Sequence, residues 1–459
     1  MLFNSIEFLY FIFLFYLFTV FFSKYWKIIF IIFSAIFYSF WNKYFLIFFY
    51  FIGFQGYLFS WLITRYRKKS HLYTFISITI SILILCFFKY GNYFINDLKK
   101  ILNSSEESKI VTYILMPVGI SFYTFQIISY VIDINNKKVK LPCIKDYLIF
   151  FSFFPHLVAG PILKARRFLP QINNGISFNI KNIKKGIILI AWGYFLKSSL
   201  ADNLSYYVDT NFNNLIGSNS VSILLSIFFF SFQIYGDFAG YSLIAIGICK
   251  TFSFHVPANF NVPYLASSFK EFWNRWHISL STFLKEYVYI PLGGNKKNTM
   301  HTYKNIIFTM TIGGLWHGSS LNFFFWGFFQ GLFISFEKFF NKICKFKIFK
   351  ILKILIIFFI ITILWVLFRF NNLEDIRLII FRIIEFNNLD LNQIKMKFLA
   401  VKCLTLVLLV LLADILITKK KFIKILKNDF VYGCTLALII FALITSGEFT
   451  GNAFIYFQF

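Results

Sequence analysis

The architecture of this chain turns on residues 306–336, whose centre reads Gly313-Gly314-Leu315-Trp316-His317-Gly318-Ser319. Apolar residues flank this motif on both sides, so an ionisable imidazole stands inside a segment of hydrocarbon-spanning length. A titratable group at bilayer depth is costly and normally faces a cavity, a pathway or the protein interior. The apolar stretch is too long for one crossing, and its glycines let the backbone leave helical geometry. We therefore expect two shorter helices that meet at a break beside His317, and we expect the chemistry there.

Composition places the whole chain in the membrane. Of its 459 residues, 58% are hydrophobic, 23% aromatic and only 14% charged, whereas a soluble domain carries about a quarter charged residues. We predict an all-α polytopic membrane protein with one domain over residues 1–459 and about 11 transmembrane helices. Their expected starts are Ile6, Trp26, Tyr44, Leu72, Tyr113, Gly186, Val221, Ile306, Ile351, Leu399 and Val431. The segment Leu148–Ile162 is short and holds Pro155 and Pro161, so it is expected to be re-entrant.

Charge orients this bundle. The formal charge of +27 does not indicate a nucleic-acid partner, because lysines lie in short clusters between apolar runs, as membrane-flanking charge does. The positive-inside rule puts the basic loops in the cytoplasm and predicts that residues 447–459 form an extracytoplasmic tail, provided that the His317 region is a hairpin. The six cysteines are scattered and predict neither disulfides nor a metal site. Membrane lipids are the partners that these features predict, and the first span, from Ile6 to Phe22, is expected to be retained.

A second informative segment is Ser267–Asn295, which mixes charged and aromatic residues. Its spacing predicts an amphipathic helix at the membrane interface, with a bend at Pro291-Leu292-Gly293-Gly294. Glu271 and Arg275 are four residues apart and can pair on one helical face, with His277 close to them.

Several motifs together resemble a known family. The runs Trp273-Asn274-Arg275-Trp276-His277-Ile278-Ser279-Leu280-Ser281, Tyr289-Ile290-Pro291-Leu292-Gly293-Gly294-Asn295 and Gly314-Leu315-Trp316-His317-Gly318 resemble motifs of the membrane-bound O-acyltransferases. Supporting stretches are Met116–Phe122, Phe154–Ile162 and Tyr235–Ser242. The resemblance follows the chain in order and is greatest to the alginate and peptidoglycan O-acetyltransferase branch.

This resemblance implies helices around a central tunnel and acyl transfer across the bilayer. The implied donor is a cytoplasmic thioester, acetyl-CoA, and the implied acceptor is a hydroxyl on the far side, which needs a positioned base. By resemblance, His317 is the general base and His277 is a second active-site histidine nearer the donor. Trp316, Trp276 and Arg275 belong to the same motifs. Asp237 lies in an apolar run and needs a partner: it could orient a histidine or pair with Arg275 as a structural element.

The last residues, Phe454 to Phe459, include one hydroxyl, that of Tyr456. A phenol has a pKa near 10 and leaves readily from an ester. The resemblance therefore implies that Tyr456 relays the acyl group to a separate extracytoplasmic transferase of the SGNH type, in a bacterial inner membrane. The alternative is that this tail is an interfacial aromatic anchor.

Other functions remain open at this point. Broken helices with polar groups also form transporter or flippase sites, although no duplicated half is seen. An inactive scaffold requires both His277 and His317 to be dispensable. His317 could also be a structural hydrogen-bonding group between helices, and His277 could be an interfacial histidine that supports the bend. Within the enzymes, D-alanyl transfer to teichoic acid is the alternative, and the sequence does not distinguish peptidoglycan from an alginate-like polysaccharide as the acceptor.

Overall fold

The chain is all-α in its computed structural model, as its composition predicts. The structure describes residues 1–101, 114–157, 160–343, 349–370, 372–384, 396–419, 425, 427–449 and 454–455. These residues form α-helices joined by short 3₁₀ and π-helices, and none of the described residues lies in a β-strand.

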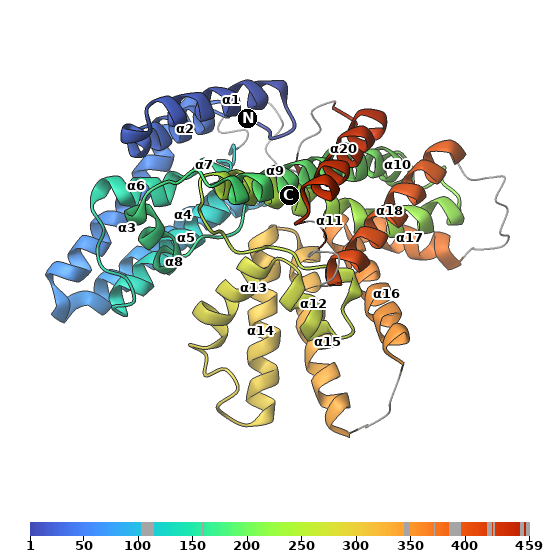
Figure 1. Cartoon of the computed structure of the whole chain (residues 1–459). Helices are drawn as coiled ribbons and strands as arrows, with labels where there is room; N and C mark the ends of the chain where they lie inside the picture. Colours follow the sequence, from blue (N-terminus) through green and yellow to red (C-terminus); the bar gives the residue numbers. More distant parts are fainter. Residues whose placement is uncertain are drawn as a thin grey trace. The chain divides into compact units, whose positions relative to one another are not determined.

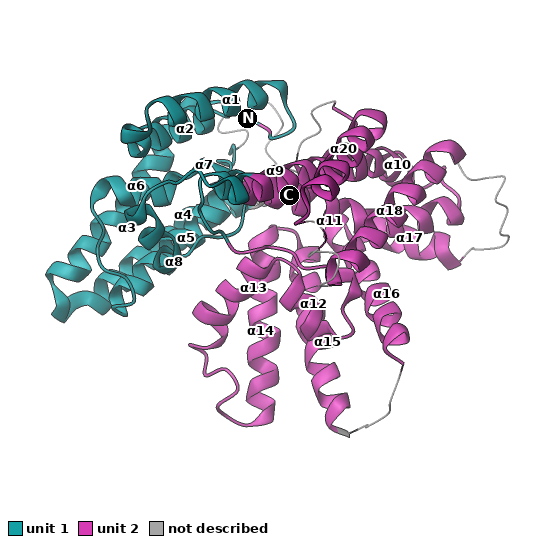
Figure 2. Ribbon diagram, in the orientation of Figure 1, with its two compact units in different colours: residues 1, 3–183, 248–256 teal, residues 2, 184–247, 257–459 magenta. Residues whose placement is uncertain are grey.

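Two compact units divide the chain (Figure 2). The first comprises residues 1, 3–183 and 248–256, and the second comprises residues 2, 184–247 and 257–459. Helices α9 (Ile180–Tyr194) and α11 (Ser220–Thr251) each contribute residues to both units. The single domain expected from the sequence stays a prediction.

The first unit is packed largely by phenylalanine. Its other helices are α1 (Ile6–Phe21), α2 (Trp26–Ser39), α3 (Lys43–Arg65), α4 (Ser70–Ile101), α5 (Ile120–Asn135), α6 (Ile144–Ser152), α7 (Phe154–Leu157) and α8 (Ala165–Asn174). Phe15 is fully buried, and its ring centroid lies 4.9 Å from Phe30 and 5.0 Å from Phe154, both near edge-to-face. Edge-to-face pairs align the positive ring edge with a negative ring face, so a chain rich in phenylalanine builds a specific core.

The second unit holds the remaining helices. They are π-helix η3 (Phe195–Ala201), α10 (Asp202–Phe212), α12 (Phe269–Arg275), α13 (Ile278–Leu284), α14 (Thr299–His317), α15 (Leu321–Ile343), α16 (Lys350–Arg369), α17 (Leu373–Ile384), α18 (Lys397–Thr418) and α20 (Asp429–Ser446).

The number of spans differs from the expected count. Among the described residues, six helices are long and apolar enough to cross a membrane, or seven if α1 and the helix after it form one bent span. Eight helices begin within two residues of the expected starts, whereas α5, α9 and α14 begin six or seven residues away from them. Helices α1 and α5 have only 16 residues each, and α2 has 14. A helix of that length is shorter than a hydrocarbon core of about 30 Å. The figure of about 11 is therefore not confirmed, although the polytopic helical class is.

The break beside His317 is confirmed. Helix α14 ends at His317, and α15 begins at Leu321 and runs back along it (Figure 1). A Cβ atom on Gly327 would lie 2.5 Å from the carbonyl oxygen of Met310, and one on Gly331 would lie 2.6 Å from Cα of Ile307. Glycine at these positions lets the two backbones touch, which makes residues 299–343 a tight antiparallel hairpin.

The interfacial helix expected over residues 267–295 is wrong as a single element. It is divided into α12, α13 and the π-helix η5 (Lys285–Tyr289). The division at His277 arises because this residue has a left-handed backbone, with φ 40° and ψ 55°. Helical geometry cannot pass through such a residue. The bend predicted at residues 291–294 is present, since Gly293 and Gly294 both have positive φ.

Candidate active site

His317 is held at the end of α14 by an aromatic enclosure. The helix begins at Thr299, after Asn298, whose side chain caps it by accepting the backbone N–H of His301 at 2.8 Å. Nineteen residues later the chain leaves helical geometry at Gly318. The buried imidazole lies 5.2 Å from the Trp326 ring of α15 and 5.1 Å from the Phe368 ring of α16, measured between centroids. Three helices therefore fix this side chain.

His277 occupies a strained connection between α12 and α13. Its side chain is fully buried, and its positive φ is uncommon for any residue other than glycine. Such a backbone costs about 1–3 kcal/mol and persists only where its surroundings enforce it. Here the backbone N–H of Ile278 donates to the carbonyl oxygen of Asn259 at 2.9 Å, which holds the connection against a neighbouring loop.

Trp316 brings the two histidines into one cluster. Its ring centroid lies 4.9 Å from that of His317 and 6.1 Å from that of His277, both in edge-to-face geometry. The two imidazoles that the sequence singled out, about forty residues apart, thus share one aromatic neighbour. Trp276, the other tryptophan singled out, reaches the same cluster through a chain of rings: Trp276 to Trp365 at 4.8 Å, Trp365 to Trp326 at 5.6 Å, and Trp326 to His317 at 5.2 Å.

Asn259 determines which nitrogen of His277 carries the proton. Its Oδ1 accepts the backbone N–H of Ser279 at 3.2 Å and the Ser279 hydroxyl at 2.9 Å, and lies 3.1 Å from His277 Nδ1. A backbone N–H can only donate, so this Asn259 atom is the oxygen and His277 Nδ1 is the donor. The Nε2 atom of His277 then carries the lone pair.

Burial keeps the His277 ring neutral. Removal from water lowers the pKa of His277 to about 3, which leaves the imidazole unprotonated near pH 7. A neutral ring with a fixed tautomer is a competent proton acceptor. Sequence reasoning missed Asn259, because an asparagine in a loop between helices carries no signal of its own.

Asp237 is paired, but with a residue that the sequence analysis did not single out. Its Oδ1 lies 2.8 Å from Nζ of Lys197, and the same ammonium lies 2.8 Å from Oδ1 of Asp202. The buried ammonium of Lys197 thus has a carboxylate on each of two helices as its partner. The signal for Lys197 was its place in the apolar run Ala191–Leu200, where a lone charge needs a partner.

Arg275 lies apart from the histidine cluster. Its guanidinium pairs with Glu271 at 2.7 Å, which confirms the predicted pair four residues apart, and it also donates to the carbonyl oxygen of Val262 at 3.2 Å. The side chains of Arg275 and Glu271 are 25% and 31% exposed. Arg275 therefore braces α12 and the loop before it.

Tyr456 lies outside the described residues. The two residues before it are described: Phe454 and Ile455 are both buried, and the backbone N–H of Ile455 donates to Oδ2 of Asp237 at 2.6 Å. The Phe454 ring lies 5.8 Å from Phe238, whose ring lies 4.6 Å from His277. The chain end that precedes Tyr456 is thus one ring away from a candidate catalytic histidine.

A cavity of about 680 Å³ opens beside the same helices. Lysine side chains and one glutamate stand among its polar residues, and Trp273 forms part of its wall and packs 5.8 Å from Trp326. Its lining residues are Ser268, Lys270, Trp273, Asn274, Ser281, Leu284, Lys285, Tyr289, Asn295, Ile306, Thr309, Met310, Ile334, Glu337, Lys338 and Asn341. Across the described ranges, no group of three histidine, cysteine or acidic side chains is arranged to hold a metal ion.

Comparison with known proteins identifies similar sequences. The family model for MBOAT, the membrane-bound O-acyltransferase family, matches residues 67–374. A probable alginate O-acetylase AlgI of Azotobacter vinelandii is 36% identical over 301 residues, which cover 65% of this chain and 60% of that protein. A peptidoglycan O-acetyltransferase of Helicobacter pylori is 33% identical over 341 residues, covering 68% and 64%. A teichoic acid D-alanyltransferase of Bacillus subtilis is 28% identical over 239 residues, covering 49% and 60%. The chain thus matches about 60% of the length of these relatives.

Proposed function

The chain belongs to the membrane-bound O-acyltransferase family, and we propose that it moves acetyl groups from a cytoplasmic thioester to a hydroxyl on the outer side of a bacterial inner membrane. The product of the pathway is O-acetylated peptidoglycan or an O-acetylated exported polysaccharide. The higher identity to an alginate O-acetylase and a peptidoglycan O-acetyltransferase than to a D-alanyltransferase supports acetyl as the group transferred.

The observation that carries this proposal is the pair of buried imidazoles around Trp316. Both rings lie within ring-contact distance of the same indole, and one has its Nδ1 proton committed to Asn259. Two imidazoles enclosed by aromatic rings can accept and return a proton where bulk water is excluded. That arrangement supports group transfer more directly than translocation of an intact solute.

The proposed step balances with the two substrates alone. The acceptor hydroxyl gives its proton to the imidazole of His317 as its oxygen attacks the thioester carbonyl. The ester C–O bond forms, the C–S bond breaks, and the proton passes to the departing thiolate. His277, with its lone pair on Nε2, lies on the donor side of this exchange.

The donor is proposed to enter through the 680 Å³ cavity. Lys270, Lys285 and Lys338 line it and suit the phosphates of a nucleotide-linked thioester such as acetyl-CoA. The basic loop that follows α15 supports a cytoplasmic mouth under the positive-inside rule.

The acceptor on this chain is proposed to be Tyr456. Its phenol oxygen takes the acetyl group, and an extracytoplasmic partner of the SGNH type then removes it as an ester of its own nucleophile. The buried position of Phe454 and Ile455 supports this relay, since it brings the end of the chain towards His277. The relay also requires the C-terminus to face the outer side.

Labelled acetyl-CoA tests the function. The purified protein in lipid nanodiscs is incubated with [¹⁴C]acetyl-CoA without any acceptor, and the labelled residue is found by mass spectrometry. We expect label on Tyr456 in the wild-type protein and none in Tyr456→Phe, with free CoA released in equal amount. The same incubation with a D-alanyl donor is run in parallel. If no residue is labelled and CoA is released no faster than without protein, the proposal is overturned. Uptake of acetyl compounds into liposomes without ester formation would favour a transporter.

A further inference from the structure

Three buried charges form a cluster that the acyl-transfer chemistry does not use. We call Lys197, Asp202 and Asp237 the Lys197 cluster; all three side chains are at most 4% exposed. The ammonium of Lys197 lies 2.8 Å from a carboxylate oxygen of each aspartate. Buried ions are costly unless each is paired and hydrogen-bonded, so a role beyond mutual pairing is expected.

The backbone is built to bring these charges together. Lys197 and Asp202 are five residues apart and lie on π-helix η3 and at the start of α10, where the backbone N–H of Asp202 donates to the carbonyl oxygen of Lys197. The i→i+5 spacing of a π-helix places such residues side by side. On α11, a Cβ atom on Gly240 would lie 2.7 Å from the carbonyl oxygen of Gly193. This close approach brings Asp237 against Lys197.

The end of the chain docks on this cluster. Oδ2 of Asp237, the carboxylate oxygen that does not face Lys197, accepts the Ile455 N–H at 2.6 Å. Phe454 is fully buried, 4.7 Å from the Tyr241 ring. Nζ of Lys197 lies 5.6 Å from the centroid of that same Tyr241 ring. The cluster and the aromatic side chain before Ile455 thus share one surface.

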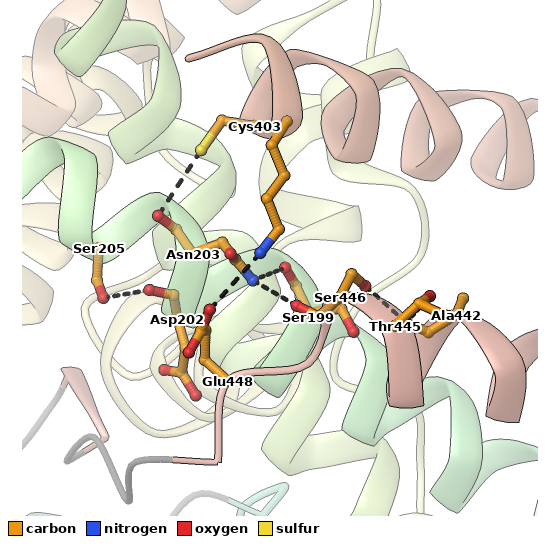
Figure 3. Close-up of polar contacts among 10 residues, drawn as sticks. Ser199, Asp202, Asn203, Ser205, Cys403, Ala442, Thr445, Ser446 and Glu448 are labelled. Atoms are coloured by element: carbon orange, nitrogen blue, oxygen red, sulfur yellow. Dashed lines mark hydrogen bonds and ion pairs between the residues drawn. The ribbon is translucent and has the colours of Figure 1, made fainter. Parts of the chain in front are cut away.

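A second set of contacts holds the chain a few residues earlier (Figure 3). The Asn203 side chain donates to the carbonyl oxygen of Ser446 at 2.8 Å. The backbone N–H of Glu448 donates to the carbonyl oxygen of Ser198 at 2.9 Å. Lys402 pairs with Glu448 at 3.6 Å. Residues 446–448 therefore contact η3 and α10, which carry Lys197 and Asp202, whereas residues 454–455 contact α11, which carries Asp237.

We propose that the Lys197 cluster is the docking site for the C-terminal segment and that Asp237, held by Lys197, positions residue 456 for reaction at His277 and His317. The docking stands on the contacts above, whereas the positioning role rests on the proposed relay through Tyr456. Lys197 orients the carboxylate through Oδ1, and the charged acceptor strengthens the hydrogen bond from Ile455 through Oδ2. Asp237 is thus a positioning residue, with no part in proton transfer.

Two variants separate docking from folding. Asp237→Asn removes the charge while Lys197 keeps Asp202 as its partner. Ile455→Pro removes the N–H that Asp237 accepts, and also replaces the side chain and fixes φ at this position. It leaves the Lys197 cluster intact, so the bundle is expected to keep its melting temperature. Ile455→Ala is the matched control, because it shortens the side chain but retains the N–H.

Hydrogen–deuterium exchange reports docking without any substrate. In the wild-type protein we expect the amides of residues 454 and 455 to exchange slowly. In Asp237→Asn we expect them to exchange about tenfold faster or more, because a neutral amide oxygen accepts a weaker hydrogen bond than a carboxylate. Ile455→Pro is expected to expose the Phe454 amide, and Ile455→Ala to leave it protected. Unprotected amides in the wild-type protein, or equal exchange in Asp237→Asn, would refute docking.

Single-turnover labelling with [¹⁴C]acetyl-CoA reports positioning. We expect Ile455→Pro to label Tyr456 about tenfold more slowly or worse and Ile455→Ala to remain close to wild type. Full labelling in Ile455→Pro with lost protection would refute the positioning role. If Tyr456→Phe retains full acetyl transfer while the wild-type amides are protected, the relay fails and the docking site stands.

Discussion

His277 and His156 are both buried histidines, yet the structure prepares only one of them as a base. Burial lowers the pKa of each to about 3. In the first unit, the side-chain amide nitrogen of Gln126 lies 3.3 Å from His156 Nε2 and donates to the carbonyl oxygen of Phe150 at 2.7 Å. An amide nitrogen can only donate, so Nε2 of His156 uses its lone pair as the acceptor. In His277 the corresponding partner, Asn259, takes the proton of Nδ1 and leaves the lone pair of Nε2 unused by that contact.

The comparison shows that burial alone does not identify a catalytic histidine. Both rings are neutral and both are in contact with phenylalanine. The difference is the kind of atom that contacts the ring. The amide N–H of Gln126 occupies the lone pair of the His156 ring, whereas the amide oxygen of Asn259 accepts the proton of the His277 ring and does not occupy its lone pair. His156, which lies between two prolines, meets a donor at Nε2, whereas His277 meets an acceptor at Nδ1.

Alanine substitution should give the largest contrast. We expect His317→Ala and His277→Ala each to slow acetyl transfer by about 10²–10⁴-fold, the usual contribution of a positioned acid or base. His156→Ala should leave the rate per folded molecule nearly unchanged. Turnover of labelled acetyl-CoA, normalised to protein that elutes as a monodisperse peak, measures this. Equal losses in His156→Ala and His277→Ala would remove the distinction between the two rings.

Asn259 should show how the tautomer is controlled. Asn259→Leu removes the acceptor for His277 Nδ1, and we expect about 10–100-fold lower kcat with a smaller change in KM, as for loss of an orienting group behind a functional histidine. Asn259→Asp keeps the acceptor and adds a negative charge, which raises the pKa of His277. The acid limb of the pH–rate profile should then move to higher pH in Asn259→Asp. An unshifted limb would mean that His277 does not set it.

Stability should fall with acid because of both rings. A free histidine has a pKa near 6.5, whereas each folded ring has a pKa of about 3. Between these values the unfolded chain binds protons that the folded chain does not, so stability is full above pH 6.5 and is lost as the pH falls. At pH 5 each ring should cost about 2 kcal/mol. Thermal unfolding in detergent from pH 7.5 to 5 measures the loss, and His156→Asn should remove about half of it. An unchanged slope in His156→Asn would contradict the buried, neutral state of that ring.

The smallest effect is expected at Gln126. Gln126→Glu replaces the donor to His156 by an acceptor, which reverses the tautomer of His156 in the first unit. We expect acetyl transfer within about threefold of wild type, since the altered group takes no part in the reaction. A loss comparable to that of Asn259→Leu would show that His156 belongs to the active site after all.

Periodicity and motif positions predicted most of the helices. They did not predict which residues, distant in sequence, contact one another. The break at His317 follows from glycines within an apolar run, and the Glu271–Arg275 pair follows from helical spacing; both are confirmed. The interruption at His277 could not be predicted, because a left-handed backbone at a histidine is imposed by the Asn259 loop, which is remote in sequence. The predicted number of spans is not confirmed, for a related reason. Hydropathy measures polarity, but whether a 14- or 16-residue apolar helix crosses lipid depends on what it packs against.

Within the site, the sequence identified the reactive groups and missed those that hold them. His277, His317, Trp316 and Trp276 are linked through ring contacts. Asp237 needed a partner, as intramembrane carboxylates do, but Lys197 is forty residues away and meets it only because glycine backbones on both helices touch. Such pairings depend on helix packing that no local pattern encodes.

The π-helix at residues 195–201 restricts which deletions related sequences can carry. A turn that closes five residues back holds one residue more than an α-helical turn. Removing a single residue from this stretch would wind it into an ordinary α-helix and turn the Lys197 side chain away from Asp202. A related protein whose aligned sequence lacks one residue in this stretch should therefore also lack the lysine at position 197 or the aromatic residues at the C-terminus.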